Sequence, residues 1–147
     1  MFTKKLPVTV QLIVIVFLVS CTTKKESSQT YSPKFQQYYV QGEVLYNNLC
    51  SNCHQVNGKG LGRLYPPVNE SDFMDNNFED VICAIKYGKK ESLKVNGIEY
   101  NMIMKSNPGL TELEVAEIAT YIYNTWSHKK GLVDVKEVSQ ILLTCNN

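Results

Sequence analysis

Apolar residues recur at helical spacing in four stretches of this chain. The pattern predicts helices over 36–49, 78–87 and 112–126, and a shorter helix that begins near Val135. The intervening segments are rich in glycine, proline and polar residues, and no internal repeat is visible. We therefore expect an all-α fold in which residues 36–147 form one small domain.

The predicted helix 112–126 has the clearest end signals. Thr111 and Glu114 stand at the spacing of a capping box, and Leu110 and Val115 at that of a hydrophobic staple. We expect its apolar face to consist of Leu113, Ala116, Tyr121 and Ile122, with Ile118 and Ala119 between them.

The other predicted helices have weaker patterns. Asn76, followed three residues later by Glu79, is the expected cap of helix 78–87, and Gly88 is its expected end. The remaining expected core positions are Val40, Val44 and Leu45 in the first helix, Val81, Ile82 and Ile85 in the second, and Val135, Val138, Ile141 and Leu142 in the last.

The N-terminus has the pattern of an export signal. Lys4 and Lys5 precede an apolar run over 8–19 that is too short to span a bilayer, so residues 1–20 are predicted to be a signal peptide. Leu18-Val19-Ser20-Cys21 resembles the lipobox of bacterial lipoproteins, which implies a lipid on Cys21. The alternative is a simple signal sequence followed by an ordinary cysteine. Residues 21–35 are polar and predict a flexible tether to the inner or outer membrane, with the domain in the periplasm.

Cys50-Ser51-Asn52-Cys53-His54 is the motif with the strongest chemical meaning. Two cysteines three apart, followed at once by a histidine, are the attachment site of a c-type haem. Residues i and i+3 share one helical face, so both thiols can reach the two vinyl groups of the ring while His54 turns toward the iron. A zinc knuckle or a redox dithiol is the alternative. The remaining candidate ligands lack knuckle spacing, and the βαβ pattern of a dithiol enzyme is absent.

The charge distribution argues against nucleic-acid binding. The formal net charge is +1, but residues from Gln36 onward include 10 lysines and arginines against 13 aspartates and glutamates. A nucleic-acid-binding domain is expected to present a basic face. Six basic residues are candidates for a docking rim near a haem edge, although a solvated surface is the favoured interpretation: Lys59, Arg63, Lys89, Lys90, Lys94 and Lys105.

The region around the motif resembles class I cytochromes c. In that family a glycine and an aromatic residue let the first helix cross closely over the last one, and Gly42 and Tyr46 match them. A proline carbonyl after the motif accepts the proton of the non-ligating imidazole nitrogen. Both Pro66 and Pro67 fit that role. Tyr121 matches a tyrosine that packs between the first helix and the haem.

The same resemblance implies a sixth ligand to the iron. The segment 95–104 is similar to the pattern Asn-Gly-x-x-Tyr-Asn-x-x-Met-Pro of bacterial respiratory cytochromes c, which places Tyr100 in the haem pocket and Met104 on the iron. Lys105 replaces the proline of the pattern, so Met102 is the rival ligand. His128, at the end of the predicted helix 112–126, is expected at the surface rather than on the iron.

The cysteine count leaves one pair. With Cys21 assigned to lipid and Cys50 and Cys53 to haem, Cys83 and Cys145 remain. We expect them to form a disulfide, which export would permit. Two buried thiols are the alternative.

These features predict a membrane-tethered monohaem electron carrier rather than an enzyme, with one covalent haem c and redox proteins or respiratory complexes as partners. Two alternatives stay open. One is a fixed haem subunit of a larger oxidase, reductase or dehydrogenase. The other is a gas-binding or peroxidase-like haem protein, which would require that no methionine binds the iron.

Overall fold

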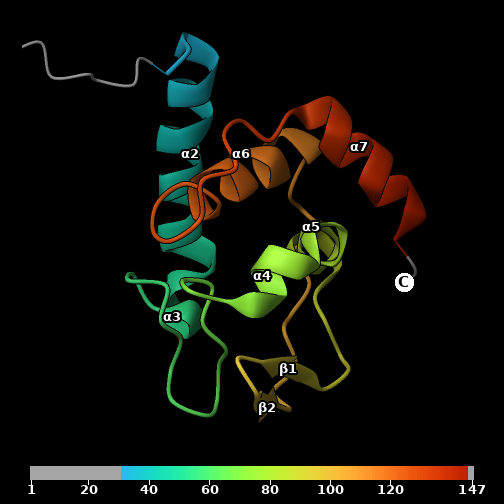
Figure 1. Ribbon diagram of the computed structural model, residues 1–147. Helices are drawn as coiled ribbons and strands as arrows, with labels where there is room; N and C mark the ends of the chain where they lie inside the picture. Colours follow the sequence, from blue (N-terminus) through green and yellow to red (C-terminus); the bar gives the residue numbers. More distant parts are fainter. Residues whose placement is uncertain (1–30, 146–147) are drawn as a thin grey trace, which may run out of the picture. The chain divides into compact units, whose positions relative to one another are not determined.

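The computed structural model describes residues 31–145, which form six helices and one two-stranded antiparallel hairpin (Figure 1). The mostly helical fold agrees with the sequence prediction, but the hairpin and the short helix α4 were not predicted. The signal peptide 1–20 and Cys21 lie outside the described residues. The elements are α2 Pro33–Leu49, α3 Ser51–His54, α4 Asp72–Asn76, α5 Phe78–Tyr87, β1 Leu93–Val95, β2 Ile98–Tyr100, α6 Glu112–Ile122 and α7 Val135–Thr144.

Helix α2 begins earlier than its apolar pattern indicates. The Ser32 side chain accepts a hydrogen bond from the Phe35 amide at 3.1 Å, and Pro33 occupies the first helical position, where its missing N–H costs nothing. The tether predicted over 21–35 is therefore wrong at its end, because residues 33–35 are already helical.

The buried face of α2 also differs from the predicted one. Val40 and Val44 are exposed, at 59% and 48%. The core is contacted instead by residues spaced three or four apart: Phe35, Tyr38, Gly42 and Tyr46. Aromatic residues and a glycine fill this face because it lies against a second helix at close range.

That second helix is α6, which crosses α2 in Figure 1. A Cβ atom at Gly42 would lie 2.0 Å from the carbonyl oxygen of Glu117, so only glycine permits the observed approach. Tyr121 of α6 lies against Tyr46 of α2, with ring centroids 5.4 Å apart. The close helix crossing expected from Gly42 and Tyr46 is present.

Helix α6 begins as predicted and ends sooner. Thr111 and Glu114 form the capping box. The helix ends at Ile122 rather than Trp126, and in the turn that follows the Tyr121 carbonyl accepts from the amides of both Asn124 and Thr125. Leu113, expected on the apolar face, is 42% exposed, whereas all residues from Val115 to Ile122 are buried.

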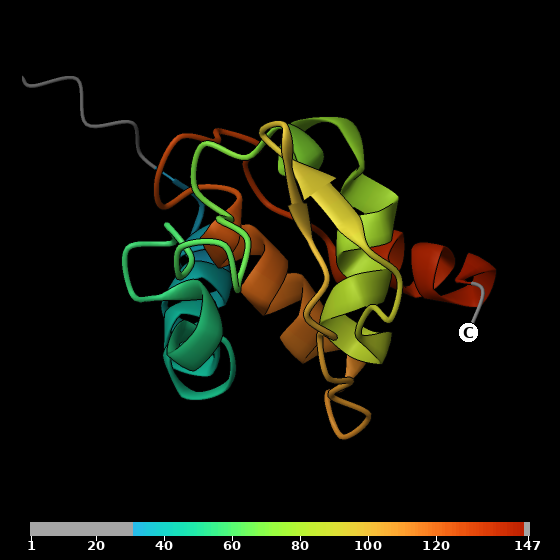
Figure 2. The ribbon, with the colours of Figure 1, turned by 90° about the horizontal axis from the view of Figure 1, so that it is seen from below.

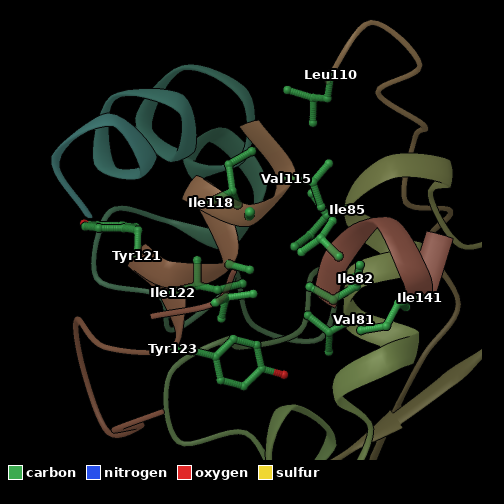
Figure 3. Packing of buried hydrophobic residues seen from close by; sticks show 14 of the residues in the cluster. Val81, Ile82, Ile85, Leu110, Val115, Ile118, Tyr121, Ile122, Tyr123 and Ile141 are labelled. Carbon is green, nitrogen blue, oxygen red and sulfur yellow. The ribbon is translucent and has the colours of Figure 1, made fainter. Parts of the chain in front are cut away.

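The hydrophobic core lies where α5, α6 and α7 meet (Figure 3). Figure 3 shows Ile85 of α5 next to Val115 of α6, and Val81 and Ile82 of α5 near Ile141 of α7. The predicted bounds of α5 are confirmed, but its cap is Asn77 rather than Asn76, without a side-chain capping bond. The Asn76 amide instead donates to the Asp72 carbonyl within α4.

A disulfide joins α5 to the end of α7. The Cα atoms of Cys83 and Cys145 are 5.7 Å apart, and the two cysteines are separated by 62 residues in the chain. The link holds the C-terminal helix against the middle of the domain and constrains the unfolded chain.

The hairpin β1–β2 lies below α4 and α5 in Figure 1, and Figure 2 shows it from that side. Asn96 and Gly97 form its two-residue turn, with φ of 50° and 79°. The Asn96 amide donates to the Asp72 side chain at 2.7 Å, which fixes the turn to the start of α4.

No helix among residues 31–145 has the length and apolar content to cross a membrane.

Candidate haem site

Cys50, Cys53 and His54 lie on one continuous turn where α2 passes into α3. The amides of Cys53 and His54 donate to the Cys50 carbonyl at 3.1 and 2.9 Å, so both thiols project from the same turn. Neither thiol is in a disulfide. Burial, with a smaller contribution from Cys53, raises the pKa of the Cys50 thiol to about 11. The turn therefore presents two thiols beside an imidazole, and the Cys50 thiol is held in its protonated form.

His54 is fixed by the loop that follows it. Its Nδ1 lies 2.9 Å from the carbonyl oxygen of Pro66. A carbonyl can only accept, so Nδ1 carries the proton and the Nε2 lone pair is left for a metal. Burial lowers the pKa of His54, and the Pro66 bond partly opposes this, so the neutral, ligating form is favoured. The structure thus chooses Pro66 over Pro67 as the carbonyl partner.

Gly60 lets this loop fold back onto the histidine. Its φ is +68°, and its amide donates to the His54 carbonyl at 2.9 Å. A Cβ atom there would lie 2.3 Å from the carbonyl oxygen of Tyr65 and 2.7 Å from that of Pro66. A side chain at this position would displace the carbonyl that orients His54.

His128 is not at the surface, so the sequence prediction for it was wrong. Its side chain is buried, with Nδ1 2.8 Å from Asp75 Oδ1 and Nε2 3.0 Å from the Val68 carbonyl. Both ring nitrogens are engaged by acceptors, which makes His128 a bridge between the loop 55–69 and α4. No local sequence signal marks this role, because its partners are 53 and 60 residues away.

Met104 and Met102 differ in how the backbone holds them. Met104 forms two backbone hydrogen bonds with Lys89, of 2.9 and 3.0 Å, and its side chain is half-buried. Gly88 makes this approach possible, because a Cβ there would lie 2.3 Å from the Met104 carbonyl oxygen. Met102 is 50% exposed and has no such pairing in the described chain.

Tyr100 links the Met104 segment to the His54 loop. Its side chain is 5% exposed, and its hydroxyl donates to the Gly62 carbonyl at 3.4 Å. The two segments that carry the candidate ligands therefore meet at the same end of the domain, where α3 and the hairpin are drawn in Figure 1.

An aromatic cluster supports the haem motif from behind. Tyr121, predicted for the pocket, packs on Tyr46 and on Trp126, and Trp126 lies against Gly58. The Tyr46 hydroxyl donates to the carbonyl of Gln55, next to His54, at 2.8 Å. The family resemblance predicts Tyr121 in this region, whereas no sequence signal marks Trp126.

The residues fit a covalently bound haem. Two free thiols on one turn and a neutral imidazole with a fixed Nδ1–H are the donor set of such a site. Exposed apolar side chains on the two facing segments suit contact with an apolar ring: Val56, Leu61, Leu64, Met102 and Ile103. The competing zinc assignment is disfavoured because Cys83 and Cys145 are bonded to each other and His128 is bonded to protein acceptors.

A mostly helical domain with this site is a c-type cytochrome. The family described as Cytochrome c matches residues 39–126, more than half of the chain. The chain therefore belongs to the cytochrome c family: it is a monohaem electron-transfer protein with covalently attached haem c, and its partners are redox proteins.

Three relatives are similar over most of the domain. Cytochrome c-552 of Thermus thermophilus is 32% identical over 101 residues, which span 66% of this chain and 76% of that protein. A second cytochrome c-552, from a particular strain of Thermus thermophilus, is also 32% identical over 101 residues, or 66% of this chain and 68% of that protein. The fructose dehydrogenase cytochrome subunit of Gluconobacter japonicus is 28% identical over 109 residues, or 69% of this chain and 22% of that protein.

Proposed function

We propose that this cytochrome is a lipid-anchored carrier of single electrons outside the cytoplasm, with Cys50 and Cys53 bonded to haem and His54 and Met104 on the iron. The hydrogen bond from His54 Nδ1 to Pro66 carries the proposal, because it leaves Nε2 for the metal beside two free thiols. Haem iron supplies the one-electron chemistry, and the protein supplies ligation, exclusion of water and placement.

Met104 is preferred over Met102 as the sixth ligand. Its pairing with Lys89 sets the position of its Cα, whereas Met102 has no comparable anchor in the described chain. A thioether ligand favours reduced iron and raises the reduction potential, which suits a carrier. A gas-binding or peroxidase-like function would instead require an open sixth position.

Three further residues shape the proposed pocket. Pro66 orients His54 through its carbonyl, Tyr100 closes the end between the two ligand segments, and Tyr121 packs behind the motif through Tyr46 and Trp126. Pro67 contributes the rigidity of a second proline in this loop rather than the carbonyl.

The membrane anchor is proposed from residues 1–21 alone. A basic start, a short apolar run and Leu18-Val19-Ser20-Cys21 support export followed by lipidation of Cys21. Metabolic labelling with a radioactive fatty acid tests this directly. Label on the parent but not on Cys21→Ser supports the anchor, and label on neither contradicts it.

A fixed subunit of a larger dehydrogenase or oxidase is the second candidate. The similarity to the cytochrome subunit of a fructose dehydrogenase favours it. Purification from the native membrane in mild detergent separates the two cases: a stable stoichiometric complex indicates a subunit, and a free monomer indicates a shuttle.

The carrier function is tested by redox titration and by carbon monoxide. We expect one reversible one-electron transition, and a reduced form that does not bind carbon monoxide because both axial positions are filled. Rapid carbon monoxide binding to the reduced parent would contradict the proposed ligation and favour a sensor or a peroxidase-like protein.

A further inference from the structure

The segment that carries Met104 has few attachments of its own. Among the described residues, hydrogen bonds from residues 101–106 to the rest of the protein are the two between Met104 and Lys89. Met102, Ile103 and Lys105 are exposed. The next attachments along the chain must therefore determine how freely Met104 moves.

On the N-terminal side Tyr100 of β2 donates to the Gly62 carbonyl, and on the C-terminal side the attachments come from the last turn of α5. The Lys86 ammonium donates to the Pro108 carbonyl at 2.9 Å and also to the Leu110 carbonyl. The Asn107 backbone amide donates to the Lys86 carbonyl at 3.0 Å, and its side-chain amide donates to the Ile85 carbonyl at 3.1 Å. We call the last four hydrogen bonds the α5 clamp.

The α5 clamp holds residues 107–110, which lie three to six positions beyond Met104. It is formed by the end of α5, and Lys89, two residues beyond that end, pairs with Met104. Hydrogen bonds from an ammonium are stronger than those between neutral groups. Lys86 also places its positive charge at the C-terminal end of α5, where the helix dipole favours a cation. Lys89 thus holds Met104 itself and the α5 clamp holds the residues that follow it, while the residue that precedes the loop, Tyr100, belongs to β2.

We propose that Lys86, assisted by Asn107, is a positioning residue that keeps the Met104 sulfur on the iron. The inference rests on the proposed ligation by Met104. Lys86 would thereby slow the replacement of Met104 by another ligand, a role separate from any general contribution to folding stability. Releasing the clamp frees the loop, so that an added ligand competes better for the sixth position.

Imidazole titration of the oxidised holoprotein, followed by absorption, measures this competition. Lys86→Met retains most of the apolar stem but removes the donors, and we expect its apparent affinity for imidazole to rise about tenfold. Asn107→Ala should shift the affinity in the same direction by less, because its side chain contributes one of the four hydrogen bonds.

Asn124→Ala is the matched control. Asn124 also holds backbone carbonyls with a buried amide, those of Thr120 and Gly131 at 2.7 and 2.8 Å, but it lies at the other end of α6. We expect this variant to lose thermal stability while its imidazole affinity stays within about twofold of the parent. A general effect of destabilisation would raise the affinity in both variants and overturn the proposal.

Met104→Ala separates failure of the clamp from failure of the ligand assignment. If Met104→Ala binds imidazole like the parent, Met104 is not the ligand and the proposed ligation fails. If Met104→Ala binds much more tightly but Lys86→Met and Asn107→Ala match the parent, the clamp alone is refuted. If Lys86→Met does not fold with haem, Lys86→Gln replaces the charged donor by a weaker neutral one, and its imidazole affinity should rise in the same direction by less.

Discussion

The two candidate iron ligands are held in different ways. On the His54 side, residues 50–69, hydrogen bonds reach the ligand's backbone and its ring: the His54 amide donates to Cys50, the Gly60 amide donates to the His54 carbonyl, and His54 Nδ1 donates to Pro66. On the Met104 side, residues 101–110, one backbone pairing with Lys89 and the α5 clamp hold the loop, and both lie at or just beyond the C-terminal end of α5. The histidine is thus preorganised by a network, whereas the methionine is presented by a loop that one element controls. We expect ligand exchange to begin at Met104.

The largest effect is expected from removing the attachment thiols. Cys50→Ala combined with Cys53→Ala should eliminate covalent haem, because no other free cysteine exists among the described residues. Haem staining of the denatured protein, after expression with a haem-attachment pathway, measures this. Covalent haem in the double variant would show that the attachment site is elsewhere.

Removing the disulfide should weaken the fold without removing haem. Cys83→Ala combined with Cys145→Ala removes a cross-link between residues 62 positions apart, so the unfolded chain gains conformational freedom. We expect the free energy of unfolding to fall by about 3–5 kcal/mol. Denaturant titration of the holoprotein measures the loss, and haem staining should match the parent. An unchanged midpoint would mean that the link contributes nothing to stability.

Two glycines allow the two sides to be perturbed in parallel. A Cβ at Gly60 would meet the carbonyls of Tyr65 and Pro66, and a Cβ at Gly88 would meet that of Met104 at 2.3 Å; both glycines have positive φ. Alanine at either position should reduce the free energy of unfolding by about 1–3 kcal/mol.

Their effects on ligation should differ. Gly88→Ala should increase the affinity for imidazole, because the new Cβ displaces Met104. Gly60→Ala displaces the Pro66 carbonyl that orients His54, so it should lower the reduction potential or the incorporation of haem. Its affinity for imidazole should rise little. Gly109→Ala is the control, because nothing lies within 4 Å of its Cβ position. Equal imidazole affinities in Gly60→Ala and Gly88→Ala would remove the distinction between the two sides.

The smallest expected effect is on the pH dependence of stability, through Glu114 in the first turn of α6. The amide and hydroxyl of Thr111 hold the pKa of Glu114 below its usual value of 4.5. A lowered folded-state pKa means that the stabilisation is complete above that usual value and is lost as the pH falls through the folded-state pKa. Denaturant titrations at pH 7 and pH 3 should show a smaller acid loss in Glu114→Gln than in the parent. Identical acid losses in Glu114→Gln and in the parent would contradict the prediction.

Local signals explain what the sequence could predict. The bounds of α5, the capping box of α6 and the Cys50–His54 turn depend on residues within a few positions of one another, so their patterns are readable along the chain. Gly42 and Tyr46 were interpretable only because they resemble a family pattern. Their partners on α6 are about 75 residues away.

The errors arose where distant contacts decide the outcome. Val40, Val44 and Leu113 have the right spacing for a buried face, but the close crossing of α2 and α6 selects other positions. The sequence position of His128 is typical of a solvent-exposed residue, but in the fold its ring is bonded to Asp75 and to the Val68 carbonyl. Spacing alone could not distinguish Pro66 from Pro67, because the sequence does not give the backbone path through Gly60 that brings the Pro66 carbonyl to His54.

Absorption spectra of the oxidised and reduced holoprotein, recorded for the parent, Met104→Ala and Met102→Ala, test the ligation most directly. We predict a low-spin parent with a sulfur-to-iron charge-transfer band that Met102→Ala retains and Met104→Ala loses. A high-spin parent, or a band that disappears only in Met102→Ala, would contradict the assignment of Met104.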